Sequence, residues 1–165
     1  MRPILAVLLA TSLALSLSAC KGDRKAQANL AAGQTFLTTN AKAPGVVSLP
    51  SGLQYKIVRS GPADGPHPHV GDEIKVNYEG KLLSGEVFDS SFQRGEPADF
   101  PLQGLIPGWV EALQLMRPGD EWILYVPPKL GYGDEPKGPI PGDSTMIFRI
   151  QLLGVLPHAG GTDLG

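Results

Sequence analysis

The chain has 165 residues, 42% of them apolar, so it can build one ordinary hydrophobic core and is too short for two full domains. Its 14 basic and 16 acidic residues give no basic field of the kind that a nucleic-acid backbone requires, which argues against nucleic acid as a partner. The 21 glycines and 16 prolines follow no strict period, which excludes collagen and predicts a turn-rich β or α+β domain.

The N-terminal segment, residues 1–19, is predicted to be a targeting signal. It has a positive start at Arg2, a nearly unbroken apolar run over residues 4–17, and small residues before Cys20. This pattern resembles a bacterial lipoprotein signal peptide, which implies cleavage before Cys20 and lipid on its thiol and new amino group. The alternatives are a plain signal peptide with a chance cysteine or a short uncleaved anchor, although the run is short for a span of ~20 residues.

Residues 20–48 are predicted to be a tether between the lipid and the main domain. The stretch 21–42 is polar and alanine-rich, and a short helix with a weak apolar face is compatible with it. Proline and glycine in residues 43–45 and 49–52 interrupt any helix and mark the start of a domain at residue 49. The apolar positions of the stretch are Leu30, Phe36 and Leu37.

The predicted domain, residues 49–157, contains segments in which apolar and polar residues alternate. A period of two is typical of a strand with one buried face, and turn residues separate the segments. The glycine-rich residues 158–165 are expected to form a flexible tail. The five strands predicted in this way centre on residues 53–57, 74–78, 87–89, 122–126 and 146–152.

One segment has the helical period instead. Trp109, Ala112, Leu113 and Met116 fall at i, i+3, i+4 and i+7, and Pro107 suits a first helical turn. A single amphipathic helix among about five strands can bury its apolar stripe only by lying on the sheet. The predicted fold is therefore α+β, with one short helix on a curved antiparallel sheet.

Four motifs then occur in an order that resembles FKBP-type peptidyl-prolyl cis/trans isomerases. They are VNYEG at 76–80, GEVFDSS at 85–91, LIPGW at 105–109 and GYG at 131–133. The opening LPSGLQY of the domain is similar to that of the bacterial macrophage-infectivity-potentiator-like group. The resemblance covers residues 49–156 and implies an FKBP-like half-wrapped antiparallel sheet around the helix, with an apolar pocket for a proline ring.

The resemblance also implies roles for individual residues. Trp109 is expected to form the pocket floor, Asp89 and the backbone of Ile106 to contact the substrate through polar groups, and Ile140 to lie on a loop that closes over the ligand. Taken alone, Trp109 would be a core residue, Asp89 a turn aspartate and Tyr132 an ordinary loop aromatic. The other residues expected to line the pocket are Tyr78, Phe88, Leu105, Tyr132 and Phe148.

Such a pocket has a mechanism that requires no nucleophile, metal or cofactor. Rotation about an X-Pro bond is opposed by amide resonance, with a barrier of ~18–20 kcal/mol. A dry aromatic site that favours the twisted amide over the planar one lowers this barrier, and a millionfold acceleration needs only ~8 kcal/mol of differential binding. The predicted substrates are proline-containing, unfolded or partly folded exported polypeptides.

The sequence leaves other interpretations of the domain's function open. The domain could be a non-catalytic chaperone or proline-peptide binding module, or a structural lipoprotein. Macrolide inhibitors are possible ligands, but family members often carry an aromatic residue where this chain has Ala98, which predicts a more open wall. His67 and His69 are weak evidence for a metal because no third ligand accompanies them. We expect a monomer on the periplasmic side of a bacterial membrane, with the outer membrane favoured over the inner.

Overall fold

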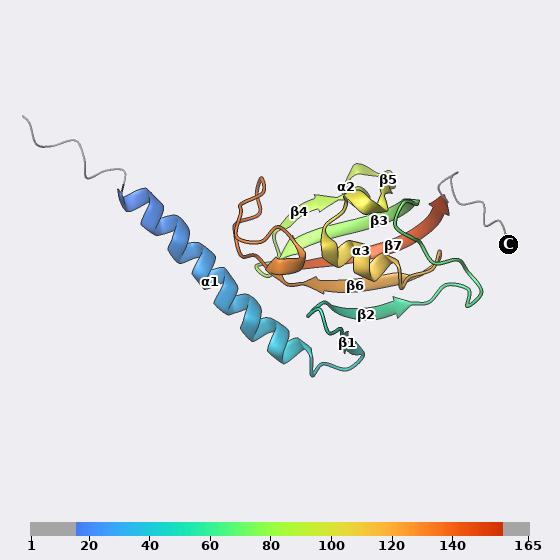
Figure 1. Ribbon diagram of the computed structural model, residues 1–165, viewed down its shortest axis with the longest axis horizontal. Coiled ribbons are helices and arrows are strands. Elements are labelled where there is room, and N and C mark those ends of the chain that lie inside the picture. The colour runs from blue at the N-terminus through green and yellow to red at the C-terminus, as the bar shows by residue number, and fades with distance from the viewer. Residues whose placement is uncertain (1–15, 157–165) are drawn as a thin grey trace, which may run out of the picture.

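The computed structural model describes residues 16–156 (Figure 1). The predicted flexible tail and residues 1–15 of the predicted signal peptide lie outside the described residues. The elements in chain order are α1 (Ser16–Asn40), β1 (Val46–Ser48), β2 (Gln54–Arg59), β3 (Glu73–Leu82), β4 (Val87–Ser90), α2 (Ser91–Arg94), β5 (Ala98–Pro101), a 3-10 turn (Leu102–Gly104), α3 (Pro107–Leu113), β6 (Glu121–Val126), a second 3-10 turn (Pro128–Leu130) and β7 (Met146–Leu156).

The strands form one antiparallel sheet in the order β1-β2-β6-β7-β3-β4, with β5 also paired to β3. Figure 1 shows α3 against one face of this sheet, as the α+β prediction required. All five predicted strands are present. The two that the sequence did not predict, β1 and β5, are only three and four residues long, too short for a period of two to stand out.

The core lies between α3 and the sheet. Trp109, Ala112 and Leu113 of α3 are buried against side chains such as Leu124 and Ile150 of the central strands. The α-helix ends at Leu113, before Met116, because the chain tightens there into i→i+3 hydrogen bonds. This tightening keeps the Met116 side chain fully buried, as its place in the apolar stripe predicted.

The alternation predicted for β2 is wrong in part. Ile57 is 46% exposed, whereas Gln54 on the other face of the strand is buried. Gln54 is buried because its amide nitrogen donates to the Leu37 carbonyl oxygen at 2.9 Å and its amide oxygen accepts from Asn40 at 2.8 Å. Both partners belong to α1, so this helix covers the face of β2 that carries Gln54.

The helix α1 is 25 residues long, well beyond the short helix expected, and its C-terminal half packs on the domain. The Asn29 amide donates to the Gly142 carbonyl oxygen at 3.0 Å, and the ring of Phe36 lies 5.7 Å from that of Tyr125. Gly33 lies against Thr145 so closely that a Cβ there would be 2.2 Å from Oγ1. The sheet also begins at β1, a few residues before the predicted domain start at residue 49. Over the described range, no helix combines the length and apolar character needed to cross a membrane.

Gly80 in β3 lies beneath two aromatic rings and provides a test of the packing. A Cβ at this position would lie 2.6 Å from Phe88 and 2.7 Å from Phe148, so Gly80→Ala must displace both rings. We expect it to lower the free energy of unfolding by about 1–3 kcal/mol, as overpacking does. Gly154→Ala in β7 is the control, because its new Cβ would meet only Lys75, at 3.9 Å. Urea unfolding should show a change within about 0.5 kcal/mol for the control, and equal losses in both variants would contradict this packing.

Candidate active site

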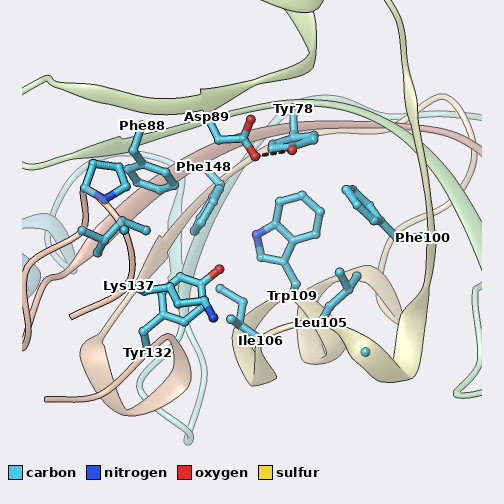
Figure 2. A pocket seen from close by; sticks show the side chains of 14 residues that line it. Tyr78, Phe88, Asp89, Phe100, Leu105, Ile106, Trp109, Tyr132, Lys137 and Phe148 are labelled. Atoms are coloured by element: carbon cyan, nitrogen blue, oxygen red, sulfur yellow. Dashed lines mark hydrogen bonds between the residues drawn. The ribbon is translucent and has the colours of Figure 1, made fainter. Parts of the chain in front are cut away.

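A cavity of about 630 Å³ lies between α3, the sheet and the loop before β7. It contains every residue that the sequence analysis placed at the site, from Tyr78 in β3 to Phe148 in β7 (Figure 2). Five further residues line it that were not predicted. The lining residues are Tyr78, Phe88, Asp89, Phe100, Gly104, Leu105, Ile106, Trp109, Tyr132, Lys137, Gly138, Pro139, Ile140 and Phe148.

The indole of Trp109 is surrounded by aromatic rings that stand nearly perpendicular to it. The ring of Tyr78 lies 5.3 Å away at 84°, that of Phe148 5.3 Å away at 85°, and that of Phe100 6.3 Å away at 78°. Phe88 in turn contacts Phe148 edge to face at 5.6 Å. Edge-to-face contacts of this kind stabilise by about 0.5–1.5 kcal/mol each beyond burial of the rings. The result is an indole floor with upright aromatic walls (Figure 2).

The chain places this floor through two local features. Pro107 occupies the first turn of α3, where its fixed φ and missing N–H suit a helix start, so Trp109 projects from the first turn. Gly108 beside it packs against β6, where a Cβ would lie 2.9 Å from Val126. A larger residue at position 108 would therefore lift the helix and its indole away from the sheet.

The polar wall of the pocket is a cluster of Tyr78, Asp89 and Arg94. The Tyr78 hydroxyl donates to one carboxylate oxygen of Asp89, and Arg94 donates to the other. Arg94 also donates to the Tyr78 hydroxyl oxygen at 3.0 Å and lies 5.5 Å from the centre of its ring. The short helix α2 turns the chain so that the Arg94 side chain lies beside Asp89. Ser90 caps the start of this helix by accepting a hydrogen bond from the Gln93 amide, and Gly95 ends it with a φ of 78°.

These contacts change the acid-base properties of the cluster. Burial alone raises the pKa of Asp89, but the hydrogen bonds from Tyr78 and Arg94 and the charge of Arg94 outweigh it, so that the pKa lies below its usual value of 3.8. Burial, followed by the hydrogen bond to Asp89, raises the pKa of Tyr78. At neutral pH the pocket therefore presents a carboxylate and a neutral phenol.

Two N–H groups at the floor have no acceptor within the described part of the chain. One is the Ile106 backbone amide, just before α3, and the other is the buried Trp109 indole Nε1. Figure 2 places the indole nitrogen on the side of the ring that faces Phe148. The Ile106 amide borders the cavity and can donate to a carbonyl oxygen bound there.

The loop before β7 closes the cavity on the side of Tyr132. Ile140 on this loop is only 5% exposed, although the residues just before it are exposed. Lys137 and Ile140 exchange two backbone hydrogen bonds, of 2.9 and 3.0 Å, so the loop tip is a closed hairpin. The Tyr132 ring remains 38% exposed at the pocket edge.

Ala98, where a more open wall was expected, does not line the cavity. Phe100, two residues later on the same face of β5, supplies an aromatic wall there instead. The Nδ1 atom of His67 lies 3.0 Å from the Met116 carbonyl oxygen, and His69 lies near Asp72. Among the described residues, no three potential ligands gather as a metal site.

Sequence reasoning missed Arg94 and Phe100, although each left a signal. Arg94 follows Asp89 by five residues across a serine-capped turn, a spacing that brings the two side chains together. Ala98 and Phe100 are apolar and the polar Asp99 lies between them, which is the alternation typical of a strand. The strand is only four residues long, however, so the pattern is weak. The lining role of Lys137 had no local signal, because the turn that positions it closes only in the folded loop.

A family model described as FKBP-type peptidyl-prolyl cis-trans isomerase matches residues 65–153, more than half of the chain. A second model, for a domain amino-terminal to such isomerases, matches residues 11–57. Among solved structures, FkpA from Escherichia coli is similar with a TM-score of 0.83 and 39% identity, over 87% of this chain and 67% of that one. AtFKBP13 is similar with a TM-score of 0.62 and 35% identity, over 66% of this chain and 97% of that one.

Curated relatives agree with these structures. The peptidyl-prolyl cis-trans isomerase Mip of Coxiella burnetii is 48% identical over 77% of this chain and 55% of its own length. The outer membrane protein MIP of Legionella longbeachae is 47% identical over 81% of this chain and 57% of its own length. The chain thus spans little more than half of these relatives. The family match, the fold and the identities together show that the chain belongs to the FKBP-type peptidyl-prolyl cis-trans isomerase family.

Proposed function

We propose that this chain is a peptidyl-prolyl cis/trans isomerase that acts on exported, unfolded or partly folded polypeptides. The observation that carries the proposal is the indole floor of Trp109 with three aromatic rings standing around it and a single paired carboxylate on the wall. A flat apolar floor of this kind fits a proline ring, which has no N–H to satisfy. Family membership and relatives that bear the name of this activity support the same conclusion.

The catalytic step is proposed to be non-covalent. The proline ring lies on Trp109 between the aromatic walls, and the amide before it rotates within the pocket. Twisting removes conjugation, so the carbonyl becomes more ketone-like and the nitrogen pyramidal. A site with little water stabilises this form relative to the planar amide, which is strongly hydrated in solution. About 8 kcal/mol of such preference accounts for a millionfold acceleration.

Polar groups at the wall and floor are proposed to orient the substrate. The Ile106 N–H donates to a substrate carbonyl oxygen next to the proline, which fixes the chain on one side of the rotating bond. The ionised Asp89 faces the polar atoms of the twisted amide, while Arg94 and Tyr78 hold its carboxylate in place. Leu105, Tyr132 and Ile140 complete the apolar surroundings, so the roles predicted from sequence are kept in this proposal.

We further propose that residues 1–19 are removed, that Cys20 carries lipid, and that residues 20–48 connect the lipid to an isomerase domain of residues 49–157. The support is the signal-like sequence that ends at Cys20, together with a relative named as an outer membrane protein. The protein is then a lipid-anchored monomer on the periplasmic side of the outer membrane.

The two tryptophans provide a matched test of the pocket. Trp109 and Trp122 are each 4% exposed and have an indole N–H without an acceptor in the described region, but only Trp109 lines the cavity. We expect Trp109→Leu and Trp122→Leu each to cost about 2–4 kcal/mol of stability. Only Trp109→Leu should lower kcat/KM on X-Pro tetrapeptides, by about ten- to a hundredfold, or ~1.4–2.8 kcal/mol of lost transition-state contact.

Assays at a temperature where both variants are folded separate activity from stability. Equal activity losses in the two variants would contradict the pocket assignment. An inactive wild-type chain that still suppresses aggregation of an unfolded protein would favour the non-catalytic chaperone or binding module.

The pH profile tests the cluster around Asp89. Because its pKa is lowered, Asp89 stays ionised in the folded protein down to below pH 3.8, and the stability this provides is lost only as pH falls through that lowered pKa. We expect kcat/KM of the wild type to be level from about pH 5 to 8. Arg94→Gln removes the positive charge that lowers the pKa of Asp89, so the fall of kcat/KM on the acid side should move to higher pH.

The control is Arg149→Gln, which removes a guanidinium that pairs with Glu121 and does not line the pocket. A carbon-13 titration of the Asp89 carboxyl group in the same variants reports its pKa directly. An unchanged Asp89 titration in Arg94→Gln would contradict the assignment.

Replacing Cys20 tests the anchor. Cys20→Ser should move the protein from the membrane fraction to the soluble periplasmic or medium fraction and abolish incorporation of labelled palmitate. The released protein should sediment as a monomer. Membrane association that persists in Cys20→Ser would contradict lipidation, and a stable dimer of the released protein would contradict the monomer.

A further inference from the structure

One of the charged groups at the pocket has no ion-pair partner among residues 16–156. Of the two charged residues that line it, Asp89 is paired with Arg94 and Tyr78. The other is Lys137, an exposed residue on the loop before β7. Within the described part of the chain no carboxylate lies in ion-pair range of its ammonium group. An unpaired cation at the edge of an apolar pocket is free to pair with a charge on a bound substrate.

The backbone of Lys137 is fixed in spite of the exposure of its side chain. Its N–H donates to the Ile140 carbonyl oxygen at 2.9 Å, and the Ile140 N–H donates back at 3.0 Å. The turn between them passes through Gly138, whose φ of 55° is readily available to glycine. Ile140 is buried and lines the pocket, so this hairpin ties the backbone of Lys137 to the pocket wall.

The base of the same loop is held from two sides. The Asn29 amide of α1 donates to the Gly142 carbonyl oxygen at 3.0 Å, and the Asp143 N–H donates to the Gly133 carbonyl oxygen at 2.8 Å. A loop held in this way loses little further freedom when a peptide binds, which reduces the entropic cost of pairing Lys137 with a substrate. Only the side chain of Lys137 has still to be ordered.

The ammonium group of Lys137 is placed to contact the substrate residues beside the proline rather than the proline itself. In Figure 2 the Lys137 side chain extends from the same side of the pocket as Tyr132, across from Asp89 and Tyr78. A proline ring on Trp109 leaves the flanking residues of the peptide at the rim, where Lys137 lies. The acids of the same loop, Asp134 and Glu135, are exposed and do not line the cavity.

We propose that Lys137 is a specificity-determining residue that favours substrates with an acidic side chain next to the proline. The proposal rests on the isomerase function proposed above and names its substrate class. The carboxylate of a glutamate or aspartate beside the proline pairs with the Lys137 ammonium, while the proline ring keeps its contacts with the indole. Pairing across a solvent-exposed rim is modest in strength and is screened by salt.

Peptide pairs that differ only in charge test this specificity. Isomerisation by the full chain is measured at low ionic strength on tetrapeptides with Glu or Gln before the proline, and on a second pair with Glu or Gln after it. We expect a Glu/Gln ratio of kcat/KM of about two- to fivefold in at least one pair, as an exposed ion pair gives. Lys137→Gln should bring that ratio to about one, Lys137→Glu should invert it, and 0.5 M NaCl should reduce it in the wild type.

The matched control is Lys129→Glu, which makes the same change of charge at an exposed position outside this cavity and should keep the wild-type ratio. Ratios of one in both wild-type pairs, or a ratio unchanged in Lys137→Gln, would overturn the proposal while leaving the isomerase function intact. Binding of the same peptides, followed by tryptophan fluorescence, gives the Glu/Gln ratio independently of turnover. An absence of turnover with all peptides would therefore reject the isomerase function, and the binding ratios would still decide the role of Lys137.

Discussion

The packing of one indole against the sheet determines the shape of the site. Trp109 projects from the first turn of α3 and meets the rings of Tyr78 and Phe148 edge to face. Both rings come from the central strands β3 and β7, so the site is built on the most extensively paired part of the sheet. Gly80 and Gly108 permit this packing, because a Cβ at either position would collide with a neighbouring side chain. A displacement of α3 would therefore alter the floor and the walls together.

The charges of the pocket are arranged so that its interior stays apolar. Asp89 would be costly on an aromatic wall without partners, but a hydrogen bond from Tyr78 and the guanidinium of Arg94 satisfy its carboxylate. The pocket can then keep an ionised group next to a surface that excludes water. The proposed non-covalent mechanism needs this combination, since a twisted amide is favoured by a dry surface and oriented by a few fixed polar groups.

The N-terminal helix is linked to the pocket through the loop before β7. Asn29 of α1 holds the Gly142 carbonyl, and Gly142 follows shortly after Ile140, which is buried in the cavity. Gln54 in β2 is likewise bonded to the end of α1. A segment expected to serve as a tether therefore packs on the domain and supports the loop that carries Lys137. The C-terminal half of α1 is thus part of the structural surroundings of the site.

The sequence alone predicts the α+β class, five of the seven strands and, through its resemblance to a known family, every aromatic residue of the pocket except Phe100. It did so because periods of two and 3.6 residues are local, and because motifs such as LIPGW carry their turn and helix signals within a few positions. It did not determine β1 or β5, the burial of Gln54 or the exposure of Ile57. These depend on which element covers a strand, and that element lies elsewhere in the chain.

The positions of Phe100 and of the loop before β7 at the pocket depend on contacts between segments that are distant in the chain. Arg94 reaches Asp89 through the local turn of α2, but Phe100 forms an aromatic wall, where Ala98 had predicted an open one, only because β5 pairs with β3. Lys137 lines the cavity because its loop closes on Ile140 and is held by Asn29, 113 residues from its partner Gly142. Contacts across such separations leave no periodic trace in the sequence, since they arise only when distant segments pack together.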